Sequence, residues 1–436
     1  MRDLILTAIV FGSIPFILKR PYIGLLVWVW LSIMNPHRLS WGFAYDMPFA
    51  MVIASATLVS LLIHFNTLQK FPLNGVTLTM ITFILWLCIS PLFAFHPENE
   101  YLYWARALKI QVMVLIALFL VGNRDELHKL VWVLALSIGF FGVKGGLFTI
   151  ATGGSSRVWG PPGSFIEDNN HVALAITMAV PLFQYLQLQA ENRWVKRSCI
   201  AAMILCVGAA LGSQSRGALL GLGAMFAFLW LKSRNKVLIG IVLILTIPMV
   251  FSVMPESWTS RMSTIKTYEQ DASALGRINA WWMAWNLALD RFPIGGGFAI
   301  YERDVFARYA PVPEDIHAAH SIYFQVLGEH GVVGLFLFLS IFALAWICGS
   351  SILRKTRERK DLEWARDLAA MSQVSLVGYL VGGAFLSLSY FDLPYYIVVV
   401  LVILRGLVDR QAVATPHSVV AKHASHVAEP EARLRR

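Results

Sequence analysis

The chain has 436 residues, of which 57% are hydrophobic and only 14% are charged, and its mean hydropathy is +0.62. Soluble domains carry roughly 25% charged residues, so this composition excludes an ordinary soluble protein and indicates a polytopic membrane protein. The formal net charge is +10. Basic cytoplasmic loops explain that charge without nucleic acid, for which the sequence carries no binding motif.

Apolar runs of about 20 residues, long enough to cross a hydrocarbon core of roughly 30 Å as helices, recur along the chain. The first 35 residues hold two short runs, 4–18 and 22–35, which form either two short spans or one span with a re-entrant piece. We predict an all-α polytopic membrane fold with about 12 transmembrane helices. The remaining runs are 46–65, 74–95, 101–122, 129–151, 171–189, 197–213, 217–232, 236–254, 331–353, 368–387 and 391–408.

Clusters of Lys and Arg indicate the orientation of these spans, because short basic loops stay in the cytoplasm. The clusters at 124–129, 193–197, 232–236 and 354–360 all fall on one side of the predicted membrane. The other side then faces the periplasm of a bacterial inner membrane. It receives the loop 153–170, the turn at 213–217 and the long segment 255–330.

The segment 255–330 is too long for an ordinary connection and carries a pattern of its own. Apolar residues recur at helical spacing between Leu275 and Leu289, among them three tryptophans, which predicts an amphipathic helix at the membrane interface. We therefore divide the chain into N-terminal transmembrane helices, a large periplasmic loop with catalytic elements, C-terminal transmembrane helices and a disordered cytoplasmic tail. Their respective bounds are 1–254, 255–330, 331–408 and 409–436.

The four cysteines lie inside apolar runs, with no CxxC pair and no histidine at ligand spacing. They predict neither a disulfide framework nor a zinc site. The predicted periplasmic side also carries no Asp-x-Asp pair of the kind that holds a divalent cation. We expect no metal and no cofactor.

Three arginines and a histidine are predicted on the periplasmic side. Arg216 stands in a short turn between two spans, Arg277 lies on the tryptophan-rich helix, and Arg157 lies in the first long loop. Each arginine taken alone is as well explained by an interfacial anchor or a solvated face. Together they suit a pyrophosphate, because guanidinium groups bind phosphate oxygens bidentately and stay charged. His320, just before a hydrophobic segment, can accept a proton from a hydroxyl at neutral pH.

These motifs, in this order, resemble those of the O-antigen ligase superfamily, which also includes polysaccharide polymerases and bacterial protein O-oligosaccharyltransferases. The resemblance covers about residues 100–408. In place of the His-Asn that is frequent in that family, this chain has His320-Ser321. The motifs that carry the resemblance are Ser215-Arg216-Gly217, Gly276-Arg277, Pro293-Ile-Gly295-Gly-Gly297-Phe298 and His320-Ser-Ile-Tyr323-Phe324-Gln-Val-Leu327-Gly328-Glu329-His-Gly331.

The resemblance implies an inverting, metal-independent glycosyl transfer at the periplasmic face. The donor would be a glycan on undecaprenyl pyrophosphate, and the acceptor a hydroxyl of lipid A-core. By motif, Arg216 and Arg277 would hold the donor pyrophosphate, and His320 would activate the acceptor hydroxyl. His317 is the alternative base. We further predict substrate contacts for Arg157, Asn170, His317 and Tyr323.

Two kinds of alternative remain open. A protein O-oligosaccharyltransferase or a polysaccharide polymerase would use the same donor with another acceptor. A transporter of lipid-linked glycans would also place arginines near an anionic head group, but along a path through the membrane and with repeat symmetry between its halves. The sequence shows no internal repeat, and its polar candidates gather on one side, which favours the enzyme.

Overall fold

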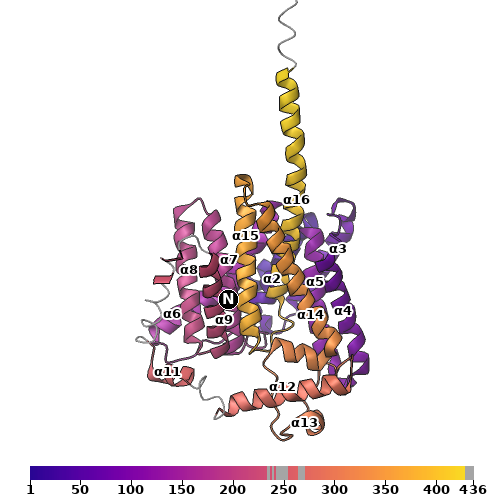
Figure 1. Ribbon diagram of the computed structural model, residues 1–436, viewed down its shortest axis with the longest axis vertical. Coiled ribbons are helices and arrows are strands. Elements are labelled where there is room, and N and C mark those ends of the chain that lie inside the picture. Colours follow the sequence, from indigo (N-terminus) through magenta and orange to yellow (C-terminus); the bar gives the residue numbers. More distant parts are fainter. Residues whose placement is uncertain (233–235, 238–239, 242–253, 264–270, 428–436) are drawn as a thin grey trace, which may run out of the picture.

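The computed structural model describes residues 1–232, 236–237, 240–241, 254–263 and 271–427, and the regular elements within them are helices. Most of these helices run side by side in one bundle (Figure 1). Six are long and apolar enough to cross a membrane, judged by length and composition. They are α4 (Gly75–Ile89) with its continuation η4 (Ser90–Phe93), α5 (Pro97–Leu120), α6 (Arg124–Ala151), α7 (Asn169–Gln189), α8 (Arg193–Gly212) and α14 (Ile322–Lys355).

The predicted all-helical architecture is confirmed, whereas the number of spans remains a prediction. The other helices of the bundle also coincide with predicted apolar runs. The run 236–254 lies almost entirely outside the described residues. These further helices are α1 (Arg2–Lys19), α2 (Pro21–Met34), α3 (Phe49–Ile63), α9 (Arg216–Lys232), α15 (Glu363–Gly383) and α16 (Asp392–Val427).

Short polar side chains fix where several helices begin. Asn74 forms a capping box with Thr77 at the start of α4. Asn123, Asp168 and Asn192 each accept a hydrogen bond from a backbone N–H in the first turn of α6, α7 and α8. Such caps satisfy amides that have no partner within the helix, so the polar residues between the apolar runs set the register of the bundle.

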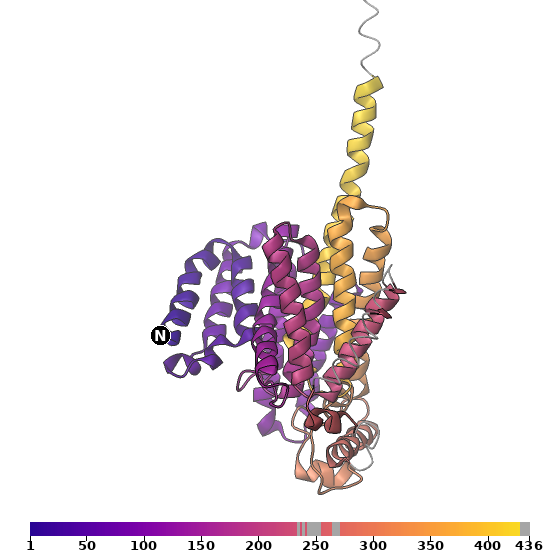
Figure 2. The ribbon, with the colours of Figure 1, turned by 90° about the vertical axis from the view of Figure 1, so that its left-hand side faces the viewer.

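The predicted basic loops gather at one end of the bundle, which we call the basic end. Lys19 and Lys129 line a common cavity there, and the Arg410 guanidinium donates to the carbonyl oxygen of Gly122 at 3.0 Å. The visible stretch of α16 extends beyond the bundle at this end (Figures 1 and 2). Three separate parts of the sequence therefore place cations at the same end.

The chain starts at the opposite end, which we call the loop end and which includes residues 36–48, 152–170, 213–216 and 271–321. The carboxylate of Asp3 accepts hydrogen bonds from the backbone N–H groups of Gly42 and Ala44, each at 3.1 Å. α1 then runs to Lys19 at the basic end, and α2 returns. The first 35 residues are thus two antiparallel helices at one side of the bundle (Figure 2).

Helix α12 (Ala272–Asp290) lies across the loop end, with α13 (Arg303–Tyr309) beneath it and α11 (Glu256–Ser263) to one side (Figure 1). It buries one face, which includes Ala280, Met283 and Leu287. A second apolar stripe points outward, with Trp282 53% and Trp285 47% exposed. The predicted amphipathic helix is present, and its exposed tryptophans suit the depth of a membrane interface.

Helix α14 starts earlier than predicted, at Ile322, and is interrupted at Gly331, whose φ of +67° breaks the helical path. A Cβ atom at Gly331 would lie 2.1 Å from the carbonyl oxygen of Pro293. The interruption leaves two carbonyl oxygens for the glycine-rich segment: Gly296 N–H donates to Gly328 and Gly297 N–H to Glu329, both at 2.9 Å. The motif at 293–298 therefore packs against this break, and the predicted start at 331 corresponds to the break.

The C-terminal tail also differs from the prediction. We expected disorder from residue 409, but α16 remains helical to Val427. Alanine has the highest helix propensity of all residues, and four alanines recur between 412 and 424.

Candidate functional site

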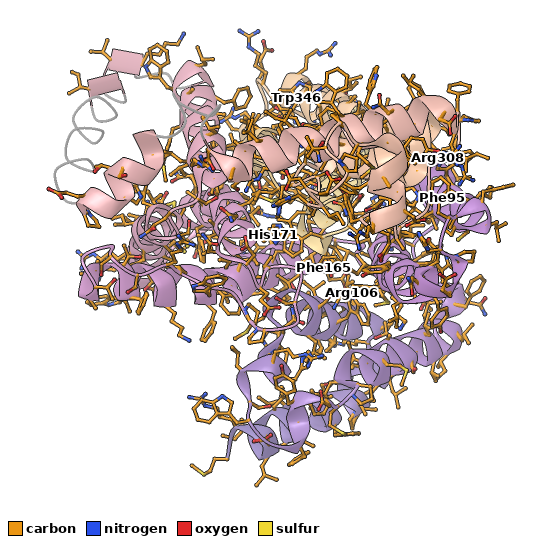
Figure 3. All side chains as sticks on the ribbon, turned by 90° about the horizontal axis from the view of Figure 1, so that it is seen from below. Phe95, Arg106, Phe165, His171, Arg308 and Trp346 are labelled. Atoms are coloured by element: carbon orange, nitrogen blue, oxygen red, sulfur yellow. The ribbon has the colours of Figure 1, made fainter. Side chains whose placement is uncertain are left out.

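The predicted arginines and histidines, together with His171, come from four separate elements that meet at the loop end. Arg216 is the first residue of α9, and Arg277 lies on α12. His317 and His320 lie in the loop before α14, and the start of α7 supplies His171. Figure 3 views the molecule from the loop end, with His171 near the middle of the picture.

Arg216 is fixed by an acidic partner that the sequence analysis did not identify. Its guanidinium forms an ion pair with the carboxylate of Asp271, and the two side chains are only 17% and 18% exposed. Asp271 is also the N-cap of α12, where it accepts a hydrogen bond from Ser273 N–H. Burial raises the pKa of Asp271, but the hydrogen bond and charge of Arg216 outweigh it, so that the pKa is lowered. This ion pair links the first residue of α9 to the N-cap of α12.

Arg277 lies six residues after this cap, about 9 Å further along the helix axis. The positive charge of its guanidinium group interacts electrostatically with the imidazole rings of both His171 and His320. The two imidazole rings lie 6.4 Å apart between centroids. His320 has a φ of +42°, which is uncommon for a residue other than glycine. Such backbone strain persists only where surrounding contacts impose it. Helices α7 and α12 thus meet the catalytic candidate His320 from two sides.

His320 is largely a neutral base. Burial lowers its pKa to about 4. The charges of Arg277, His171 and His317 also lower this pKa, whereas the negative charge of Asp168 raises it. Its Nδ1 atom is buried and has no hydrogen-bond partner among the described residues. An unprotonated imidazole with an unused nitrogen can accept a proton from a bound hydroxyl.

This lowered pKa predicts the pH dependence of any reaction in which His320 is the base. The neutral form is lost only as the pH falls through about 4, so the rate should stay flat from pH 7 to about 5 and decline below that. The pH profile of kcat in the wild type, compared with His317→Ala, measures this. A decline centred at the ordinary histidine pKa of about 6.5 would contradict the assignment.

The alternative base, His317, has an acidic partner. Its Nδ1 atom lies 2.8 Å from a carboxylate oxygen of Asp315, and the side chain is 44% exposed. Its ring lies over Gly276, where a Cβ atom would come within 2.7 Å of Nδ1. The glycine beside Arg277 thus allows the histidine loop to approach α12 closely. The carboxylate of Asp315 orients this ring.

Two side chains of α12 hold the loop that carries the histidines. The amide of Asn279 donates to the carbonyl oxygens of Val312 and Asp315 and accepts from Val312 N–H, at 2.8, 2.9 and 2.9 Å. Trp281 donates to the carbonyl oxygen of Ala319 at 2.6 Å, and its ring stacks on that of Phe324. Trp281 therefore positions His320 and does not face substrate, whereas Trp282 and Trp285 remain exposed.

Asn279→Ala should remove three hydrogen bonds, cost about 1–3 kcal/mol of stability, and lower kcat about tenfold by loosening the loop before His320. Asn286→Ala on the same helix is the matched control, because Asn286 donates to the carbonyl oxygen of Tyr309 near α13 and not to the loop before His320 in the part of the chain that the structure describes. Thermal unfolding and a transfer assay would separate the two effects. Equal losses of activity in both variants would show that α12 supports the site only through stability.

The remaining predicted substrate contacts fall into two groups. Arg157 lies near the cluster, with its Nε 3.5 Å from the side-chain oxygen of Gln214, and Asn170 donates to its own helix cap, Asp168, at 2.9 Å. Both stay predictions. Tyr323 is different: its hydroxyl donates to the carbonyl oxygen of Leu380 on α15 at 2.7 Å. That bond directs the hydroxyl toward α15, and a substrate contact of Tyr323 stays a prediction as well.

Sequence reasoning missed Asp271, Asp168 and His171. The two aspartates carry the signature of helix caps, since each stands directly before a helical run. His171 gave no signal of its own. Among the described residues, no group of three or more His, Cys, Asp or Glu side chains is arranged to hold a metal ion.

Comparison with known families divides the chain into two parts. Residues 201–339 match the sequence model of a family described as O-antigen ligase. Residues 1–191 match a family of unknown function (DUF5935). No curated protein matches the chain. The first match contains Arg216, Arg277 and His320, and the second contains His171.

Proposed function

The chain belongs to the O-antigen ligase superfamily through residues 201–339, and on that premise we propose that it is an O-antigen ligase. It transfers a glycan from undecaprenyl pyrophosphate to a hydroxyl of lipid A-core, in lipopolysaccharide biosynthesis. Members of this family are ligases that transfer glycans. The particular donor, acceptor and mechanism are our proposal.

The observation that carries the proposal is the placement of a neutral buried histidine beside an arginine. Arg277 acts on His320 electrostatically, and Arg216 is tied to the same helix through Asp271. Guanidinium groups neutralise phosphate oxygens without titrating. A base with a low pKa remains unprotonated beside these cations. Anion binding and proton removal can thus take place at one site.

In the proposed reaction, the oxygen of the acceptor hydroxyl attacks the anomeric carbon of the donor glycan. His320 takes the hydroxyl proton as the new C–O bond forms. The bond between the anomeric carbon and the pyrophosphate oxygen breaks, and its electron pair leaves with undecaprenyl pyrophosphate. Arg216 and Arg277 stabilise the charge that develops on the leaving group, so no metal is required. Attack opposite the leaving group inverts the anomeric configuration.

The distribution of charge supports the orientation. Short loops rich in Lys and Arg remain in the cytoplasm, and Lys19, Lys129 and Arg410 lie at the basic end. The candidate site lies at the loop end, which would then face the periplasm of the bacterial inner membrane. About 12 spans fit this arrangement. The exposed Trp282 and Trp285 would anchor α12 at the periplasmic interface.

A transfer assay with the purified protein in lipid nanodiscs tests this proposal. Undecaprenyl-pyrophosphate glycan and lipid A-core are supplied in EDTA, and the anomeric configuration of the product is determined by NMR. We expect glycosylated lipid A-core with inverted configuration. Parallel reactions offer a second donor glycan or a protein as acceptor. Transfer only to one of these would establish a polymerase or a protein O-oligosaccharyltransferase, and a requirement for metal would refute the mechanism.

A further inference from the structure

A cavity of about 650 Å³ opens at the loop end, and the mechanism above uses none of its lining residues. It lies between the start of α5, the loop 152–170, the segment 298–302, the first half of α14 and Tyr390. Figure 3 labels two of its lining residues, Phe165 and Arg106. The guanidinium of Arg106 lies 4.8 Å from the ring centroid of Phe165.

A buried carboxyl group, that of Glu329, lines this cavity. The Glu329 side chain is 3% exposed and accepts a hydrogen bond from the hydroxyl of Tyr390 at 2.5 Å. The Gln325 side chain, one turn earlier on α14, is also within hydrogen-bonding reach. Ser389 fixes that amide by donating to its oxygen at 2.8 Å. Burying a carboxylate is costly, and two neutral donors leave acceptor capacity on its oxygens.

The rim of the cavity is aromatic. Tyr101 and Tyr103, in the first turns of α5, are 68% and 56% exposed, whereas Phe298, which also lines the cavity, is buried. The face of an aromatic ring carries partial negative charge, which attracts the weakly positive C–H bonds of a sugar ring. Exposed tyrosines above a fixed carboxylate thus offer both a stacking surface and a hydrogen-bond acceptor.

The charged residues that line the cavity make an anionic ligand unfavourable. Glu98 and Glu302 line the cavity, and Arg106 is the cation among its described lining residues. Arg106 is itself engaged, because it donates to the carbonyl oxygen of Gly163. A pyrophosphate would be repelled by this set and is better served by Arg216 and Arg277. An uncharged molecule with many hydroxyls suits the cavity.

We propose that this cavity binds an uncharged sugar residue of one of the two glycan substrates, with Glu329 accepting a hydrogen bond from a sugar hydroxyl and Tyr101 stacking on the ring. This inference rests on the proposed function. The sugar belongs either to the acceptor or to the donor glycan, and the recognition chemistry is the same for both. The volume, about 650 Å³, lies within the usual range for small-ligand pockets.

Tyr301 also lines the cavity. Burial and the nearby charge of Glu329 raise the pKa of Tyr301 well above its ordinary value, whereas the backbone of Ala319 acts in the opposite direction. Both Tyr301 and Glu329 line the cavity.

Direct binding measurements test this proposal without relying on catalysis. The probes are core oligosaccharide released from lipopolysaccharide by mild acid, and donor glycan released from its pyrophosphate carrier. Each is titrated into the full-length protein in nanodiscs by calorimetry, and contacts are checked by saturation-transfer NMR. We expect one probe to bind, and its Kd to rise about tenfold or more in Glu329→Gln, which replaces one carboxyl oxygen with an amide group that can only donate.

Tyr101→Ala is the second variant, because an exposed side chain can be removed without unfolding the protein. It should weaken binding of the same probe severalfold. The matched controls are Phe43→Ala, an exposed aromatic at the loop end outside the cavity, and Glu314→Gln. Both should bind as the wild type does. His320→Ala should also retain binding, because the cavity is built without that side chain.

The outcomes separate this inference from the proposed function. If neither probe binds, or if binding is unchanged in both Glu329→Gln and Tyr101→Ala, the cavity is not a sugar site, even if transfer is observed. Suppose that a probe binds, that its binding depends on Glu329 and Tyr101, and that no acceptor is glycosylated. The sugar site is then supported, and the ligase proposal is contradicted. The probe that binds identifies the substrate.

Discussion

His320→Ala is expected to lower the rate of glycan transfer by about 10²–10⁴-fold, the usual contribution of a general base. The side chain is held in a left-handed backbone conformation, close to His171 and under the charge of Arg277. With alanine, the acceptor hydroxyl would have to release its proton to water. The rate constant of a single turnover at saturating donor and acceptor measures this loss.

Alanine variants of two other histidines at the loop end, His317 and His96, serve as comparisons for His320→Ala. His317→Ala should retain most of the activity, because His317 is half exposed and bound to Asp315. His96→Ala is a control from the same end of the molecule, where His96 pairs with Asp304. If His317→Ala abolished transfer while His320→Ala did not, the base would have to be reassigned to His317.

Arg216→Ala and Arg277→Ala should each reduce kcat by about 10²–10³-fold, similar to the loss of one donor to a developing anion. Both guanidinium groups are proposed to stabilise the same leaving pyrophosphate. The effect of the double variant should therefore be smaller than the product of the single effects. Single-turnover rates for all three variants, with donor binding measured separately, test this expectation.

Lysine substitutions distinguish charge from geometry at these positions. Arg216→Lys and Arg277→Lys should recover only part of the rate, because an ammonium group cannot bind phosphate bidentately. Arg308→Lys on α13 is the control: its side chain is 62% exposed and pairs with Asp290. Full activity in Arg277→Lys would mean that only positive charge matters there.

Much of the fold is predictable from the sequence, because a helix that crosses a membrane needs an uninterrupted apolar run of known length. The positions of α3 to α9 follow from that requirement. The start of α14 does not, since the segment from Ile322 to Gly331 mixes polar and apolar residues. Its helical path depends on packing against the glycine-rich segment at 293–297, a contact between distant parts of the chain.

The candidate site was predictable in its residue types but not in its partners. Arg216, Arg277 and His320 stand out because charge and histidine are rare beside spans. Their neighbours Asp271 and His171 come from other elements, and only the folded chain brings them near. The cavity at Glu329 gave no local signal, because a glutamate inside an apolar helix looks the same whether it faces lipid, protein or a ligand.

The most direct test of the central claim is an experimental structure with undecaprenyl pyrophosphate bound. We expect phosphate oxygens about 3 Å from the guanidinium nitrogens of both Arg216 and Arg277, with the His320 ring facing the glycan side. A second cationic groove at the loop end, lined by Arg2, Arg38 and Lys144, is the natural competitor. A pyrophosphate bound there, with Arg216 and Arg277 empty, would contradict the proposed site and its mechanism.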